Sequence, residues 1–166
     1  MSHQYENRIA KEIWHAEPVY VRAYRAGYSG SGAMPQPDVH IKDNSSGMSH
    51  DVEIKGPIKG DTVKIDADDA NQMEGCRSHM TRSHLTIKFQ NRAPITIPLL
   101  DTDGYDERTP LEQLKFIADE SYPFLNARIP GEYLYLDKPS LDDWESATAA
   151  KDDFREILRS VGIYKE

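Results

Sequence analysis

Two short segments in which apolar and polar residues alternate constrain the fold more than any other part of the sequence. They are residues 38–42, Asp-Val-His-Ile-Lys, and residues 51–55, Asp-Val-Glu-Ile-Lys. Strict alternation is typical of strands that bury one face. Residues 43–47 between them are Asp-Asn-Ser-Ser-Gly, a cluster of turn formers. The two strands are therefore predicted to pair as an antiparallel hairpin.

Further helices and strands are predicted on both sides of this hairpin. Tyr5, Ile9 and Ile13 recur every four residues, which indicates a helix over residues 4–16 with one buried face. Runs of β-branched and aromatic residues predict additional strands, and polar periodic or glycine-rich segments predict a helix and two loops. The strands are expected at 19–24, 84–89 and 95–99, the helix at 66–80, and the loops at 27–32 and 56–60. This order predicts an α/β fold with a mixed central β-sheet flanked by helices.

The composition and charge of the sequence change after residue 98. Thr109-Pro110 is a favourable helix start, residues 133–136 read as a strand, and residues 140–161 read as a final helix ending at Gly162. The net charge is -8, and the whole deficit lies in residues 99–166, which hold eight basic and sixteen acidic residues. We therefore expect a core at 1–98 and an acidic α+β C-terminal extension at 99–166, packed on that core. The acidic residues are either a surface for a protein partner or ordinary solvated helix faces.

Length and composition exclude several classes of protein. The 166 residues fit one domain with a small appendage. The sequence has no run of about 18 apolar residues, so no membrane-spanning helix is expected, and residues 1–6 are polar where a signal peptide would be apolar. Cys76 is the single cysteine, which excludes a disulfide framework and a thiolate zinc cluster within one chain. A reducing cytoplasm, that of a host cell if the chain is viral, is the expected setting.

Three charged residues of the hairpin stand where a buried sheet would carry apolar ones. Glu53 and Lys55 lie on one face of their strand, and the hairpin brings Asp38 beside Glu53. Two adjacent carboxylates repel one another unless a cation joins them, and Mg²⁺ binds carboxylate and water oxygens. Lys55 would then orient an attacking water or offset charge on a phosphate. The alternative is that these charges form a solvated hairpin face.

The same residues match a known nuclease pattern, Pro-Asp…(Asp/Glu)-x-Lys. Pro37-Asp38 supplies its first part, and Glu53-Ile54-Lys55 supplies its second. The pattern stands in a fixed order of elements: a helix with Glu6, a strand, a Ser/Gly loop, the two strands of the motif, then a helix and another strand. Over residues 4–98 the chain resembles the archaeal-type Holliday-junction resolvases, which have a restriction-endonuclease-like core.

The resemblance implies a function and a set of roles. Members of that family are homodimeric, metal-dependent endonucleases that cut two opposing strands of a four-way DNA junction. By the match of position, Glu6 would join Asp38 and Glu53 at the Mg²⁺ site, where Mn²⁺ is an alternative ion. Ser29 or Ser31, in the loop before Asp38, would assist cleavage. The candidate DNA contacts are Arg8, Arg22, Arg25 and Lys59.

Two alternatives to a junction resolvase stay open. The first is a nuclease on the same scaffold that cuts duplex or single-stranded DNA. The second is a non-catalytic binding module whose acidic region, residues 99–166, docks a protein partner. The complete set of Asp38, Glu53 and Lys55 favours an enzyme.

Overall fold

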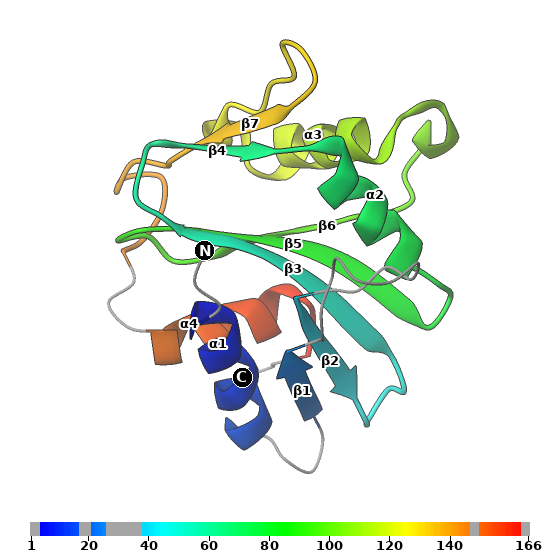
Figure 1. Cartoon of the computed structure of the whole chain (residues 1–166), viewed down its shortest axis with the longest axis vertical. Coiled ribbons are helices and arrows are strands. Elements are labelled where there is room, and N and C mark those ends of the chain that lie inside the picture. Colours follow the sequence, from blue (N-terminus) through cyan, green and yellow to red (C-terminus); the bar gives the residue numbers. More distant parts are fainter. Residues whose placement is uncertain (1–3, 17–20, 26–37, 147–149, 164–166) are drawn as a thin grey trace.

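A computed structural model of the chain describes residues 4–16, 21–25, 38–146 and 150–163. Within these ranges five strands form a central sheet in the order β1-β2-β3-β5-β6, and two more form a separate sheet, β4-β7 (Figure 1). β3 and β5 run parallel while the other neighbours are antiparallel, so the expected mixed central sheet is confirmed. The strands are β1 (Val21–Arg25), β2 (Val39–Asp43), β3 (Ser49–Ile58), β4 (Thr62–Ile65), β5 (Thr81–Phe89), β6 (Ile95–Pro98) and β7 (Leu134–Asp137).

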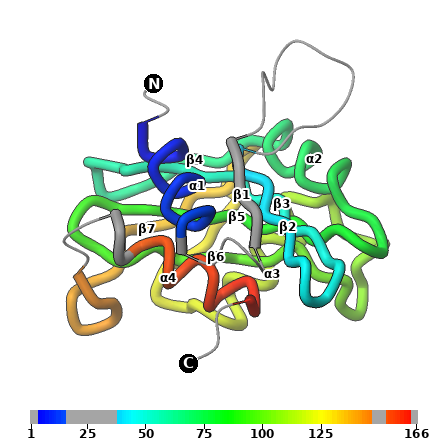
Figure 2. Tube along the Cα trace, turned by 90° about the horizontal axis from the view of Figure 1, so that it is seen from below, coloured from blue at the N-terminus to red at the C-terminus, as the bar shows by residue number. Residues whose placement is uncertain are grey.

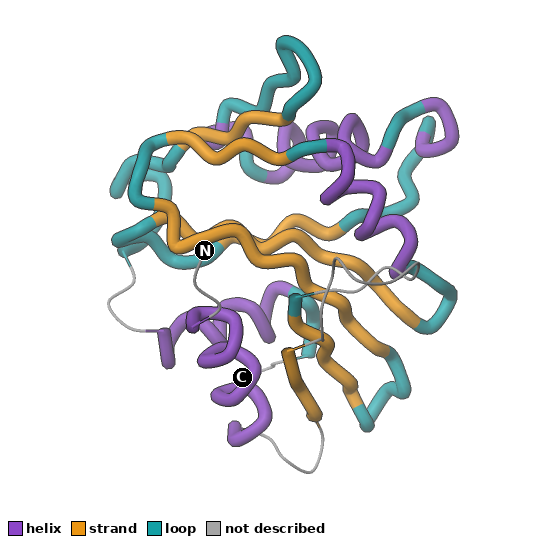
Figure 3. The backbone as a smooth tube through the Cα atoms, in the orientation of Figure 1, coloured by secondary structure: helices purple, strands orange, loops and turns teal. Residues whose placement is uncertain are grey.

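Helices cover both faces of the central sheet. One pair of helices packs on one face, and the other pair, together with the β4-β7 sheet, covers the opposite face (Figures 1 and 2). Figure 3 shows the same layers coloured by secondary structure. The first pair is α1 (Gln4–Ala16) and α4 (Ala150–Ser160), and the second is α2 (Ala67–Cys76) and α3 (Pro110–Ser121). Two short 3-10 turns, η1 (Tyr105–Glu107) and η2 (Pro123–Leu125), flank α3. None of the helices in the described ranges has the length and apolar character needed to span a bilayer.

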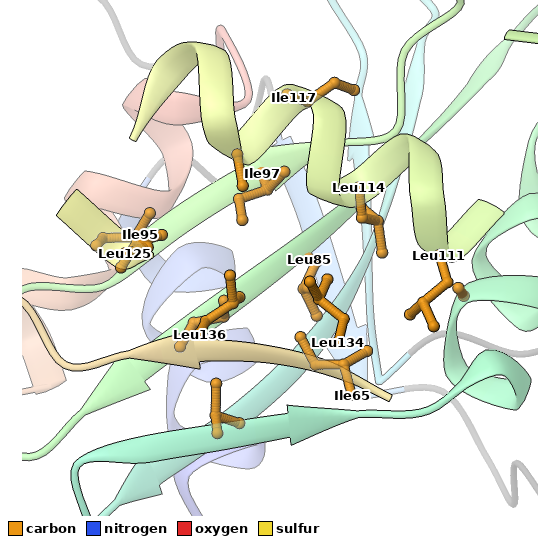
Figure 4. Packing of buried hydrophobic residues seen from close by; sticks show 14 of the residues in the cluster. Ile65, Leu85, Ile95, Ile97, Leu111, Leu114, Ile117, Leu125, Leu134 and Leu136 are labelled. Carbon is orange, nitrogen blue, oxygen red and sulfur yellow. The ribbon is translucent and has the colours of Figure 1, made fainter. Parts of the chain in front are cut away.

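Two hydrophobic cores lie on opposite sides of the central sheet. The larger core packs β5 and β6 against α2, α3 and the β4-β7 sheet (Figure 4). The smaller core packs α1 and α4 against β2 and β3. β5 supplies apolar side chains to the larger core, and its residues 83–89 are all buried, as expected of a strand with a layer on each face. Residues 99–166 therefore supply parts of both cores, and a division into two domains at residue 98 stays a prediction.

Strand β3 extends into the loop expected at residues 56–60, so the loop begins only after Ile58. β3 continues through Gly56 and Pro57 to Ile58, with an irregular register against β5 after Lys55. At Gly56 φ is +130°, and an added Cβ would lie 2.2 Å from the Lys88 carbonyl oxygen. The glycine thus permits a close approach of two strands, which a sequence pattern cannot distinguish from a turn.

The helix expected at 140–161 does not begin at Ser140, because residues 141–143 form a turn. Trp144 N–H donates to the Ser140 carbonyl at 2.9 Å, but its indole N–H donates to the Ala93 carbonyl, also at 2.9 Å. Ala93 N–H in turn donates to the Glu145 carbonyl at 2.8 Å. These bonds attach the turn to the chain just before β6, and the described part of helix α4 runs over Ala150–Ser160.

The other expected helices and strands are found with small shifts of boundary, and the loop expected at 27–32 lies outside the described residues. The helix expected at 66–80 ends at Cys76, and the short strand β4 before it was not anticipated. α3 begins with the expected Thr109 cap, whose side chain and that of Glu112 each accept from the other's backbone N–H. α4 is followed by Gly162, where φ is +88°.

Candidate active site

The β2-β3 hairpin brings Asp38 and Glu53 together at the start of β2. Val39 pairs with Val52 across the two strands, so the next step of the antiparallel register sets Asp38 opposite Glu53. Asp38 Oδ2 accepts a 2.8 Å hydrogen bond from Ile54 N–H, which fixes this carboxylate to the neighbouring strand. The structure therefore places the two carboxylates side by side, as the alternation of the sequence indicated.

Their environment favours the protonated forms. Burial, opposed by the Ile54 N–H and reinforced by the charge of Glu6, raises the pKa of Asp38 to about 6. Burial, and then the charge of Asp38, raises the pKa of Glu53 to about 9. At neutral pH and without a cation, Glu53 thus keeps its proton while Asp38 is largely ionised. A cation between them would allow both to ionise.

Glu6 lies within electrostatic range of this pair. It is in the first turn of α1, it is 7% exposed, and its charge raises the pKa of both Asp38 and Glu53. The first helix therefore directs a third carboxylate towards the hairpin. Among the described residues, however, no three His, Cys, Asp or Glu side chains are grouped closely enough to enclose an ion.

Two carboxylates are sufficient for the expected ion. Mg²⁺ is commonly held by one or two carboxylates, and water molecules complete its octahedral shell. Asp38 and Glu53 meet this requirement, because they are adjacent, partly exposed and mutually repulsive when ionised. The residues present therefore fit Mg²⁺ with Asp38 and Glu53 as protein ligands, and Glu6 contributes negative charge nearby.

Lys55 is paired with a residue that the sequence did not single out. Its Nζ lies 2.7 Å from Asp69 Oδ2, in the first turn of α2. Burial lowers the pKa of Lys55, but the hydrogen bond and charge of Asp69 and the charge of Glu53 outweigh it, so the pKa is raised. The capping pattern that begins at Asp66 indicates the helix start, yet it cannot tell which strand residue Asp69 will face. Asp69 keeps Lys55 charged and holds its ammonium near Glu53.

A second pair of polar side chains lies next to Asp38 and Glu53 on the hairpin. His40 and Asp51 are cross-strand partners next to Asp38 and Glu53, and His40 Nδ1 is hydrogen bonded to Asp51 Oδ1. The pKa of Cys76 is raised to about 12, first by burial and then by Asp51, to which its thiol donates. Cys76 therefore stays a thiol rather than a nucleophilic thiolate. The alternation at 38–42 was a usable signal for His40, since it sets that residue on the face of Asp38.

The other predicted site residues are placed only in part. Arg8 is exposed on α1, and Lys59 is exposed just after β3. Arg22 and Arg25 lie in β1, but their side chains are outside the described part of the structure. Ser29 and Ser31 lie outside the described residues, so their roles stay predictions.

Comparison with known proteins supports the fold. No family model matches the sequence, and no curated protein matches it. Among solved structures, the Holliday junction resolvase Hjc of the archaeal hyperthermophile Archaeoglobus fulgidus is similar, with a TM-score of 0.55 and 16% sequence identity. The chain has the resolvase fold. The match covers 82% of this chain and 88% of Hjc, so the similarity extends beyond residues 4–98.

Proposed function

We propose that this protein is a Mg²⁺-dependent, structure-selective endodeoxyribonuclease that resolves four-way DNA junctions by paired nicks. The observation that carries the proposal is the adjacent pair Asp38 and Glu53, with Lys55 two residues along the same strand. The proposal is supported by the fold, which is shared with a Holliday junction resolvase. A solvated hairpin face does not account for carboxylates buried enough to raise their pKa values.

Each residue has a distinct part in the proposed reaction. Asp38 and Glu53 hold the ion, and the Ile54 N–H keeps Asp38 in place. Bound Mg²⁺ would lower the pKa of a coordinated water and offset negative charge on the phosphate. The Lys55 ammonium, kept protonated by Asp69, stabilises the additional charge that develops on the phosphate during cleavage.

The proposed substrate determines the assembly. A resolvase nicks two strands of like polarity, which requires two identical sites related by a two-fold axis, hence a homodimer. Contacts to phosphates and to the shape of the branch would select the junction, rather than contacts to base edges. The proposed DNA contacts are Arg8, Arg22, Arg25 and Lys59, with Ser29 or Ser31 acting at the cleaved strand. Mn²⁺ is expected to substitute for Mg²⁺, and the cytoplasm is the proposed setting.

The decisive experiment compares cleavage and binding in one set of variants. Asp38→Asn removes a ligand charge with little change of shape, so it should abolish Mg²⁺-supported cleavage of a labelled junction while retaining binding. Lys55→Ala should lower the cleavage rate by roughly 100-fold or more, the scale of one electrostatic donor. Asp142→Asn, an exposed carboxylate of the turn before α4, is the matched control and should cleave normally. Cleavage at the wild-type rate by Asp38→Asn would show that the site is assigned wrongly.

Substrate selectivity and oligomeric state test the resolvase part separately. Competition binding at fixed salt should favour the junction over linear duplex of equal length, and light scattering should give a dimer. If the protein is a monomer that cleaves duplex or single-stranded DNA as well as it cleaves the junction, the nuclease assignment stands and the resolvase assignment is wrong. Absence of cleavage on all three substrates, with either Mg²⁺ or Mn²⁺, would instead favour a binding module with a protein partner for residues 99–166.

A further inference from the structure

The two-stranded β4-β7 sheet has one buried face and one outer face. Its inner side chains are Val63, Ile65, Leu134 and Leu136, all buried in the larger core, and Figure 4 shows three of them facing α3 and the central sheet. Because side chains alternate along a strand, the residues between them point away from that core. The outer face is therefore directed away from the central sheet, on which Asp38 and Glu53 lie (Figure 1).

Two tyrosines and two cations form a row on the outer face. Lys64 of β4 is the cross-strand partner of Tyr135 in β7. On the other side of β7, Arg128 pairs with Tyr135 through two backbone hydrogen bonds of 3.1 and 2.9 Å. The rings of Tyr133 and Tyr135 lie edge to face, with centroids 6.4 Å apart. We call these four residues the tyrosine row: Lys64, Arg128, Tyr133 and Tyr135.

The cations of the row lie over the faces of the rings. Lys64 Nζ is 4.4 Å from the centroid of Tyr133, and Arg128 Cζ is 5.7 Å from that of Tyr135. Asp137 also lies on this face, where Thr62, Asn126 and Arg128 contact its carboxylate at 3.0, 2.9 and 3.0 Å. Lys64 and Arg128 together with Asp137 carry a formal charge of +1, and the Lys64 side chain is exposed. This local excess of positive charge contrasts with the net charge of -8 for the chain.

We infer that the tyrosine row binds a segment of single-stranded nucleic acid. Single strands present unstacked bases and a regular series of phosphates, and proteins bind them with aromatic rings beside cations. Tyr133 and Tyr135 would stack with bases through the ring faces opposite these cations, while Lys64 and Arg128 would contact the phosphates. Stacking is tolerant of sequence, so little preference among bases is expected. The inference does not depend on the proposed cleavage, because the row lies on a different surface from Asp38 and Glu53.

Binding of fluorescein-labelled oligomers tests the inference directly. The full chain, in EDTA to prevent cleavage, is titrated into oligo(dT) and oligo(U), and fluorescence anisotropy is recorded. Each of Tyr133→Ala and Tyr135→Ala should weaken binding by about tenfold, the scale of one stacked base. Tyr133→Phe and Tyr135→Phe keep the ring and should bind like the wild type. The two oligomers show whether DNA, RNA or both are accepted.

The cations have a matched pair of variants. Lys64→Ala should weaken binding and reduce its salt dependence, because fewer counterions are released. Lys115 is a half-exposed lysine on α3, paired with Asp119 at 2.6 Å, and Lys115→Ala should leave binding unchanged. Equal effects of the two lysine variants would show that only overall charge matters, and would overturn the inference.

Photo-crosslinking gives a readout that a purely structural role of the tyrosines would not produce. Oligomers containing iodouracil should crosslink to the peptide that contains Tyr133 and Tyr135. Crosslinks confined to other peptides, or no binding of either oligomer by the wild type, would show the inference to be wrong. Junction cleavage by Tyr133→Ala should remain near the wild-type rate, so failure here is distinguishable from failure of the proposed function.

Discussion

The charge state of Glu53 yields a prediction that links the candidate site to stability. Its carboxyl is buried next to Asp38, which raises its pKa from 4.5 to about 9. Glu53→Gln keeps the shape of the side chain and removes its ionisation. Without divalent metal, the variant should therefore be more stable than the wild type at neutral pH, although it is expected to lose cleavage. A more stable but inactive protein is the pattern expected of a site kept for function.

The magnitude follows from the two pKa values. At pH 7, which is about 2.5 units above the ordinary pKa of 4.5, the Glu53 carboxyl is ionised in the unfolded chain. In the folded chain it holds a proton. At roughly 1.4 kcal/mol per unit, this protonation costs about 3 kcal/mol of folding free energy. Because the folded pKa is raised, the cost is absent below pH 4.5 and grows as the pH rises towards about 9.

Urea unfolding in EDTA at pH 4 and pH 7 measures this difference. With a slope of about 2 kcal/mol per molar urea, Glu53→Gln should shift the midpoint at pH 7 by roughly 1.5 M and leave it unchanged at pH 4. Glu120→Gln, at an exposed carboxylate near the end of α3, is the control and should shift neither midpoint. Saturating Mg²⁺ should stabilise the wild type more than the variant. The same gain at both pH values would refute the electrostatic reasoning, since it would indicate improved packing.

Three further tests, each read out as the free energy of unfolding, address the packing that supports the site. Leu114→Ala, at a fully buried position in the larger core, should cost about 3 kcal/mol, whereas Leu141→Ala, at a position 63% exposed, should change stability by less than about 0.5 kcal/mol. Gly56→Ala should cost about 3 kcal/mol or more, because φ is +130° and the new Cβ would meet the Lys88 carbonyl oxygen at 2.2 Å; a smaller cost would show that the strands separate easily. Lys88→Met should cost about 3–5 kcal/mol, because Asp153 stays buried without its 3.2 Å ion pair. Adding Asp153→Asn to this variant should recover most of the lost stability. If it does not, the charge of Asp153 is not the cause of the loss.

The hairpin and the identity of the paired carboxylates follow from the sequence alone. Alternation over 38–42 and 51–55, with a turn between them, fixes which residues share a face, because strand side chains repeat every two residues. The same local signals located α1, α3 and the strands β5 and β6 to within a few residues. These features depend on neighbours in the chain, and a sequence pattern reports such neighbours directly.

The distant residues that complete the site, and the ends of some elements, depend on contacts that form only in the folded chain. Asp69 reaches Lys55 because α2 packs across β3, and the charge of Glu6 reaches Asp38 because α1 covers the hairpin. The strand β3 continues through Gly56 because β5 approaches it closely, and residues 141–143 form a turn in place of a helix because Trp144 bonds to Ala93. In each case the deciding contact joins residues that are far apart in the chain. Local propensity carries no information about such contacts, so the structure was needed to reveal them.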